Sequence, residues 1–104
     1  RGFRFIHILI PCPTGWLCAA KDSIRIGRLA VLSRVFPLIE VFSGKLYRLN
    51  SMGDKIPVND YLSAQGRFKT LSTEDYSIVQ SEIDKRWSEL NSLTRFKSHP
   101  DLEG

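Results

Sequence analysis

An apolar, β-branched run that stops at a proline-flanked cysteine constrains this chain more than any other feature. The run covers residues 3–10 and leads into Pro11-Cys12-Pro13 and then Thr14-Gly15-Trp16. Its nearly continuous apolar character, bounded by turn residues, predicts a strand covered on both faces. Ligands collect in the loops that follow such strands in open α/β sheets. Pro13 favours extended backbone at Cys12. A thiol held in this way suits a metal ligand, and it suits a plain buried cysteine equally well.

The length and composition describe one small domain or a piece of a larger one. The chain has 104 residues, 42% of them hydrophobic and 25% charged, which is ordinary for a globular protein. No apolar run approaches the roughly 18 residues of a membrane span. The apolar start is broken by Arg4 and His7 and makes a poor secretory signal. We therefore expect a cytoplasmic protein with reduced thiols and no membrane partner. A start at Arg1 favours a fragment or a processed product.

Charge is distributed unevenly along the chain. Residues 1–50 carry eight basic and two acidic residues (+6), and residues 51–104 carry seven basic and nine acidic residues (−2), which together give the net +4. A basic first half invites a nucleic-acid interpretation. However, the arginines at 25, 28 and 34 are dispersed and no aromatic stacking motif accompanies them. We expect no nucleic-acid partner.

Helix and turn signals predict the elements after the cysteine loop of residues 11–20. The predicted elements are a helix over 21–34, strands over 38–42 and 46–49, a short helix over 58–64 and a long helix from Ser72 to about Phe96. Asp22 or Ser23 can cap the first helix, and Ser43-Gly44-Lys45 suits a hairpin turn. Trp87 lies on the apolar stripe of the last helix as a packing anchor, and His99-Pro100 ends that helix.

The residues alone show no self-contained active site. No nucleophile elbow, metalloprotease helix, phosphate-binding loop or dinucleotide fingerprint is present. His7 is interpreted as a core or face-filling histidine. Cys12 and Cys18 cannot complete a zinc site without metal-spaced histidines nearby. On this basis the chain is a small α+β unit with one well-placed cysteine.

The exact residues of the N-terminal segment are more informative than the pattern of apolar and polar positions. The segment Phe5-Ile6-His7-Ile8-Leu9-Ile10-Pro11-Cys12-Pro13-Thr14-Gly15-Trp16 closely resembles the last sheet strand and following loop of the β subunit of 2-oxoacid:ferredoxin oxidoreductases, nearest to the pyruvate type. The resemblance continues through Phe36–Glu40, Gly44–Tyr47, Pro57–Leu62, Gln65-Gly66-Arg67-Phe68-Lys69 and Asp84–Trp87.

That resemblance implies an enzyme segment that is not active alone. It implies oxidative decarboxylation of a 2-oxo acid, with coenzyme A as acyl acceptor and ferredoxin as electron acceptor. The implied cofactors are thiamine diphosphate, Mg²⁺ and a [4Fe–4S] cluster, for which Cys12 matches the fourth ligand. Thr14, Gly15 and Trp16 are candidates for shaping the cofactor pocket or for plain turn geometry. No catalytic residue is assigned, and Cys18 matches no ligand position.

The upstream cysteines and the magnesium-binding residues of the family are absent from this sequence, so the remaining β-subunit sequence and other subunits would have to supply them. The expected fold is α/β: residues 1–34 would end a thiamine-diphosphate-binding parallel sheet, and residues 35–104 would form a C-terminal extension. The alternative is a non-catalytic α+β module that binds a protein partner.

Overall fold

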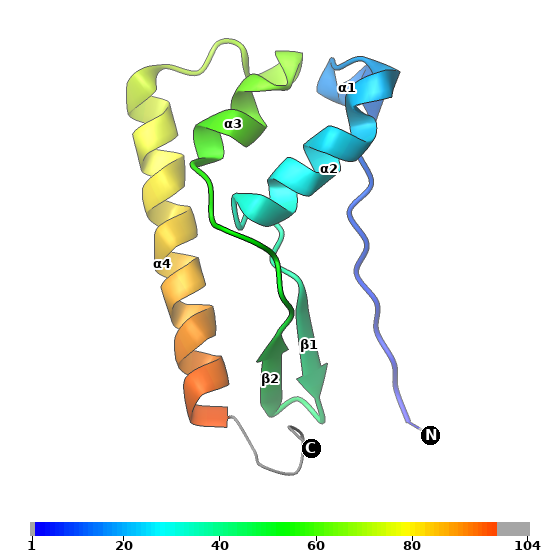
Figure 1. Ribbon diagram of the computed structural model, residues 1–104, viewed down its shortest axis with the longest axis vertical. Coiled ribbons are helices and arrows are strands. Elements are labelled where there is room, and N and C mark those ends of the chain that lie inside the picture. The colour runs from blue at the N-terminus through cyan, green and yellow to red at the C-terminus, as the bar shows by residue number, and fades with distance from the viewer. Residues whose placement is uncertain (1, 98–104) are drawn as a thin grey trace.

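The computed structural model describes residues 2–97, except for the side chains of residues 95–97, and shows an elongated arrangement of helices beside one hairpin (Figure 1). The elements in order are α1 (Pro13–Trp16), η1 (Ala20–Asp22), α2 (Ser23–Leu32), β1 (Ile39–Phe42), β2 (Leu46–Leu49), α3 (Val58–Ser63), η2 (Gly66–Phe68) and α4 (Thr73–Lys97). Within residues 2–97, no helix is both long enough and apolar enough to cross a bilayer.

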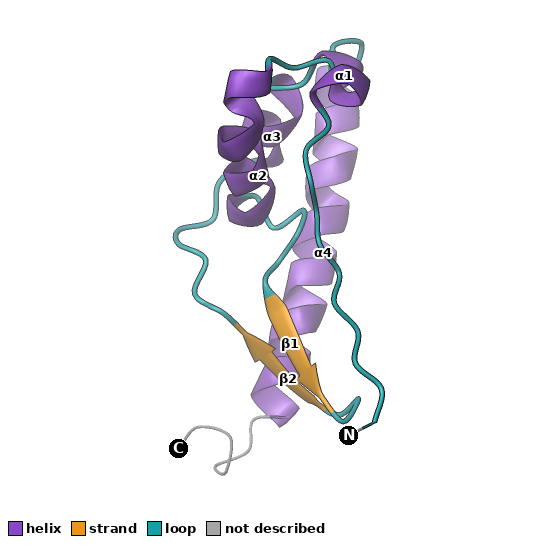
Figure 2. Ribbon diagram, turned by 90° about the vertical axis from the view of Figure 1, so that its right-hand side faces the viewer, coloured by secondary structure: helices purple, strands orange, loops and turns teal. Residues whose placement is uncertain are grey.

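The long helix α4 packs against α3 and the hairpin along its length. Helices α2 and α3 lie beside one half of it and the hairpin beside the other half (Figures 1 and 2). The fully buried apolar side chains come from α2, α3 and α4 and are Ile26, Ala30, Val58, Tyr61, Leu62 and Ile83. The radius of gyration is 15.9 Å, against about 13 Å for a compact domain of about 100 residues. The core is therefore small for the length of the chain.

The start of α4 is confirmed as the sequence predicts it. The Asp75 N–H donates to Ser72 Oγ at 3.1 Å, and the Ser72 N–H donates to Asp75 Oδ2 at 2.9 Å. This reciprocal pair is a capping box, which satisfies two amides at the helix start. Because the end predicted at His99-Pro100 lies outside the described residues, only the start is tested.

The hairpin is also confirmed. Strands β1 and β2 pair antiparallel with Glu40 opposite Arg48 and Phe42 opposite Leu46. Ser43 and Gly44 have φ values of 55° and 66°, and Lys45 N–H donates to the Phe42 carbonyl at 3.0 Å. Two consecutive positive φ values are the pattern of the tight turn that matches the twist of paired strands.

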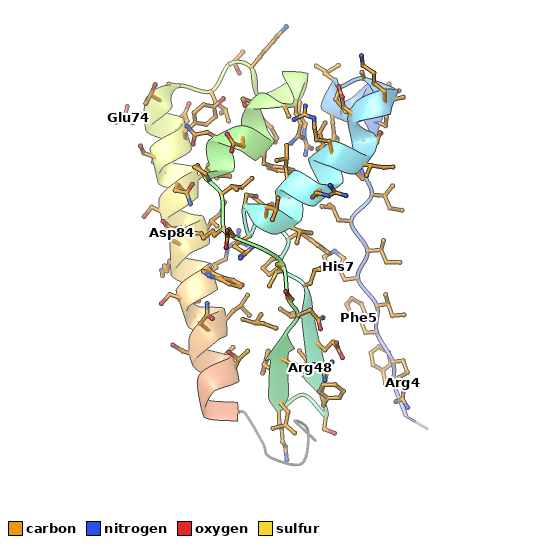
Figure 3. All side chains as sticks on the ribbon, viewed as in Figure 1. Arg4, Phe5, His7, Arg48, Glu74 and Asp84 are labelled. Atoms are coloured by element: carbon orange, nitrogen blue, oxygen red, sulfur yellow. The ribbon has the colours of Figure 1, made fainter. Side chains whose placement is uncertain are left out.

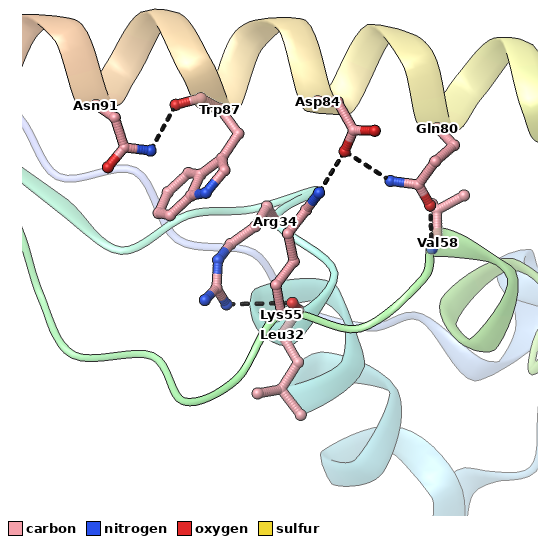
Figure 4. Close-up of polar contacts among 8 residues, drawn as sticks. All are labelled: Leu32, Arg34, Lys55, Val58, Gln80, Asp84, Trp87 and Asn91. Carbon is pink, nitrogen blue, oxygen red and sulfur yellow. Dashed lines mark hydrogen bonds and ion pairs between the residues drawn. The ribbon is translucent and has the colours of Figure 1, made fainter.

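Arg34 follows the end of α2, and its side chain contacts the Leu32 carbonyl and lies by Trp87 of α4 (Figure 4). The residue has a φ of 69°. Its Nη1 donates to the carbonyls of Val31 and Leu32 at the end of the helix, and Nη2 donates to the Gly53 carbonyl at 2.7 Å. The guanidinium carbon lies 4.8 Å from the centroid of Trp87. Trp87 therefore packs as predicted, with a buried arginine over its ring.

The predicted cap of α2 is not formed. Asp22 makes no side-chain capping bond, and Ser23 Oγ donates to the Ala20 carbonyl instead. The reason is that the 3₁₀ turn η1 extends the helix backwards, so Asp22 already has helical backbone with φ −94° and ψ −1°. In that conformation its side chain is not placed to accept from the amides that follow.

The strand predicted over residues 3–10 is not formed within the described residues. Residues 2–10 are extended but pair with no strand, and the described part of the chain holds a single two-stranded sheet, β1–β2. Phe3, Phe5, Ile6, Ile8 and Ile10 are 69–88% exposed rather than covered on both faces. A strand requires a neighbour to accept its hydrogen bonds, and no described segment lies in that position. Ile24, in the first turn of α2, is also exposed.

Candidate functional site

Cys12 lies at the surface, at the point where the extended N-terminal segment turns into α1. Its backbone is extended, with φ −115° and ψ 98°, as predicted for a residue that precedes proline. Pro13 occupies the first turn of α1, a position where its missing N–H costs nothing. The Trp16 N–H donates to the Cys12 carbonyl at 2.8 Å. The loop predicted over 11–20 therefore contains one short helical turn that fixes the backbone of the cysteine.

Gly15 leaves the space beside the sulfur open. A Cβ atom on Gly15 would lie 3.4 Å from Cys12 Sγ. Cys12 is a free, exposed cysteine, and a side chain at position 15 would stand against it. A soft thiolate ligand with open space around the sulfur fits an iron–sulfur corner.

The loop rests on η2, which lies much later in the chain. The Arg67 guanidinium carbon is 4.1 Å from the centroid of Trp16 and 4.5 Å from that of Phe68. Trp16 also meets Tyr61 edge-on at 6.5 Å. Trp16 thus packs between α3 and η2 and anchors the loop to the folded part of the chain.

The other candidates occupy different surroundings. Thr14 is exposed. Cys18 is a free cysteine, partly buried against the hydrophobic core, which is consistent with a structural thiol. His7 is exposed and not in the core, and its ring meets Phe36 edge-on at 5.1 Å. Figure 3 shows Phe5 and His7 on the extended N-terminal segment, away from α4.

The residues that this chain contributes do not form a complete metal site. Among the described residues, no group of three or more histidine, cysteine, aspartate or glutamate side chains could hold a metal ion. A groove of about 470 Å³ lies elsewhere, between the start of α3 and α4, and is lined by polar side chains including Gln80 and Asp84. This groove does not include Cys12 or its neighbours. The candidate site is therefore a separate surface, the loop of residues 12–16.

Comparison with known proteins identifies relatives of this chain. No protein-family model matches the chain. The chain is 40% identical over 95 residues to the ketoisovalerate oxidoreductase subunit VorB of Pyrococcus horikoshii. This match covers 88% of the chain and 30% of that protein. It is 39% identical over 86 residues to the pyruvate synthase subunit PorB of Methanocaldococcus jannaschii, covering 83% of this chain and 29% of that protein.

The chain is related to the β subunits of 2-oxoacid:ferredoxin oxidoreductases. A third relative, the PorB subunit of Methanosarcina barkeri, is 38% identical over 72 residues. The chain spans about 30% of the length of the first of these relatives. It therefore corresponds to a segment of a β subunit, and the resemblance expected from the Pro-Cys-Pro-Thr-Gly-Trp loop is confirmed.

The β-subunit segment contains supporting residues that sequence reasoning did not place. Gln65, Gly66 and Arg67 belong to a segment that carries the resemblance, but the sequence pattern assigns them no structural role. The structure brings all three against residues 16 and 17 or onto the core beneath them. The sequence offers one signal, a glutamine next to a glycine and an arginine. This combination indicates a close contact at Gly66, but it does not identify the residue contacted.

Proposed function

We propose that this chain forms the C-terminal part of a β subunit. The complete enzyme would oxidatively decarboxylate a 2-oxo acid, and pyruvate is the substrate that we propose. In this proposal Cys12 supplies one thiolate of a [4Fe–4S] cluster. The observation that carries it is an exposed, free thiol on a fixed backbone beside Gly15, in a chain related to such subunits. Coenzyme A and ferredoxin are the proposed acyl and electron acceptors.

The remaining ligands and the thiamine diphosphate site come from outside this chain. When bound, the cluster supplies one-electron transfer, and thiamine diphosphate with Mg²⁺ supplies the decarboxylation chemistry. This chain contributes the Cys12 thiolate and the wall around it. Gly15 keeps the space next to the sulfur open, and Trp16 fixes the loop through Tyr61 and Arg67. Thr14 is exposed on the same turn, where it can line the cofactor pocket.

The extended N-terminal segment supports assembly with the rest of the subunit. Its isoleucines at 6, 8 and 10 are exposed, and its backbone has no partner strand among the described residues. An apolar segment of this kind is stabilised when it adds to a sheet and is covered on both faces. We infer that residues 3–10 become a strand of the parallel sheet that the remaining β-subunit sequence forms.

A matched pair of cysteine variants in the complete complex tests the proposal. Cys12→Ser should lower iron content and abolish the cluster's electron paramagnetic resonance signal, together with ferredoxin reduction, while subunit assembly is retained. Cys18→Ser is the control and should leave iron, signal and activity unchanged, because Cys18 packs on the core. Normal iron content in the Cys12→Ser complex would contradict the assignment. A native complex without iron and thiamine would instead support a non-catalytic interaction module.

A further inference from the structure

We propose that Gln65, Gly66 and Arg67 form a positioning brace that holds the Cys12 loop in the geometry required for cluster ligation. We call these three residues the brace. The inference rests on the proposed role of Cys12 as a ligand. It concerns residues that touch neither the sulfur nor any cofactor in the structure and that act through Trp16 and Leu17.

The first contact of the brace is between backbones. The Gly66 N–H donates to the Leu17 carbonyl at 2.9 Å. A Cβ atom on Gly66 would lie 2.7 Å from the Leu17 Cβ and 2.8 Å from the Leu17 oxygen. Such distances are too short for a real side chain, and one of the two atoms is backbone. Only glycine at position 66 lets η2 approach the end of α1 this closely.

Leu17 is where the loop most needs such support. Its φ is 55°, a left-handed conformation that carries a steric cost for a leucine and persists only where surrounding contacts maintain it. This conformation ends α1 one residue after Trp16. The hydrogen bond from Gly66 is a contact that holds Leu17 in place from outside the loop.

The second contact runs through side chains. Gln65 is 1% exposed, and its Nε2 donates to the Tyr61 carbonyl at 2.9 Å. Its Oε1 accepts from Arg67 Nε at 2.7 Å. Both polar ends of the buried amide therefore have hydrogen-bond partners, and the amide oxygen orients the Arg67 side chain. A buried amide with both ends bonded fixes one geometry, because any other leaves a polar group unpaired.

Arg67 transmits this orientation to the cysteine. Its guanidinium lies over Trp16, and the Trp16 N–H donates to the Cys12 carbonyl. The path from the core to the ligand is thus Tyr61, Gln65, Arg67, Trp16 and Cys12. Three of the four links join residues within four positions of each other. The contact of Arg67 with Trp16 is the long-range link, and it joins two distant parts of the chain.

The test compares two arginine variants in the complete enzyme complex. Arg67→Met keeps an unbranched apolar side chain beside the rings but removes the guanidinium and its bond to Gln65. Arg48→Met is the control, because Arg48 is an exposed arginine on β2, paired with Glu40 at 3.4 Å and outside the brace. The readouts are the rate of iron loss to a chelator and the electron paramagnetic resonance line shape of the reduced cluster. Gly66→Ala is a second variant that pushes on Leu17 directly.

The brace predicts that Arg67→Met loses cluster iron about tenfold faster than the wild type, at the lower end of the affinity losses that follow removal of an outer partner of a metal ligand. Its resonance lines should broaden, and Arg48→Met should match the wild type. If Arg67→Met and a folded Gly66→Ala both keep the wild-type rate and line shape, the brace is overturned. Failure of the ligand assignment itself is distinguishable, because then Cys12→Ser would also retain its cluster.

Discussion

The guanidinium carbon of Arg34 lies 4.8 Å from the ring centroid of Trp87, which joins the end of α2 to the middle of α4 (Figure 4). Hydrogen bonds from the same guanidinium to Val31, Leu32 and Gly53 close the helix end and hold the loop before α3. One buried side chain thus connects three segments around a small core.

Replacing Arg34 should therefore be costly. We expect Arg34→Ala to lower the free energy of unfolding by about 2–4 kcal/mol, because charged hydrogen bonds and a buried cation–π contact are lost together. Urea unfolding followed by circular dichroism measures this loss. Arg28→Ala is the control, since Arg28 is exposed on the same helix. Equal midpoints for the two variants would show that the Arg34 contacts contribute little.

The capping box at the start of α4 gives a second stability prediction. Ser72→Ala removes the acceptor for the Asp75 N–H and should cost about 1 kcal/mol. Ser77→Ala, at an exposed position inside the same helix, should cost nothing because alanine is the better helix former. Thermal unfolding of the two variants side by side checks the difference. A loss at position 77 as large as at position 72 would refute the cap.

The pair Lys55–Asp84 predicts a dependence of stability on pH. The hydrogen bond from Lys55, and then that from Gln80, lowers the pKa of Asp84 below its usual value of 3.8. Since the folded pKa is the lower one, Asp84 contributes stability above pH 4, and this contribution is lost as pH falls through the folded pKa. Asp84 is half exposed, so the contribution should stay below about 1 kcal/mol.

A double-mutant cycle isolates that contribution. Lys55→Met, Asp84→Asn and the combined variant are unfolded in urea at pH 7 and at pH 3. The coupling energy between the two positions should be present at pH 7 and smaller at pH 3. A coupling energy of the same size at both values would mean that the ionised carboxylate is not what stabilises the pair.

The exposed N-terminal segment predicts an assembly defect. In the complete subunit, Ile8→Lys should prevent correct folding or assembly, because a charge would enter a strand covered on both faces. Ile78→Lys is the control, at an exposed position on α4 that is 60% accessible. Size-exclusion chromatography of the two complexes compares them. Normal assembly with Ile8→Lys would contradict burial of this segment in a sheet.

Local signals were enough to predict the helices α2, α3 and α4 and the hairpin, but not α1, η1 and η2. Ser72 with Asp75 marks the start of α4, and Ser43-Gly44 determines the turn between β1 and β2, because each signal acts within four residues. Cys12 was correctly expected on extended backbone for the same reason. These are features whose cause lies next to them in the sequence.

The features that sequence reasoning missed have distant causes. Residues 3–10 have the composition of a strand, but pairing depends on a neighbour that the described chain does not contain. The contact of Arg67 with Trp16 depends on how α3 and η2 lie against the loop. In each case the tertiary arrangement decided the outcome.

The lone extended segment before Cys12 has a consequence for the order of maturation. The loop is fastened on its C-terminal side by α3 and η2, while the residues before it gain few contacts to offset the conformational entropy of about 1–2 kcal/mol for each ordered residue. The loop already fixes the backbone of Cys12, so docking of the preceding segment would complete the surroundings of the thiol. If Cys12 ligates the cluster as proposed, we expect iron to be inserted after, and not before, residues 3–10 have joined a sheet of the complete subunit.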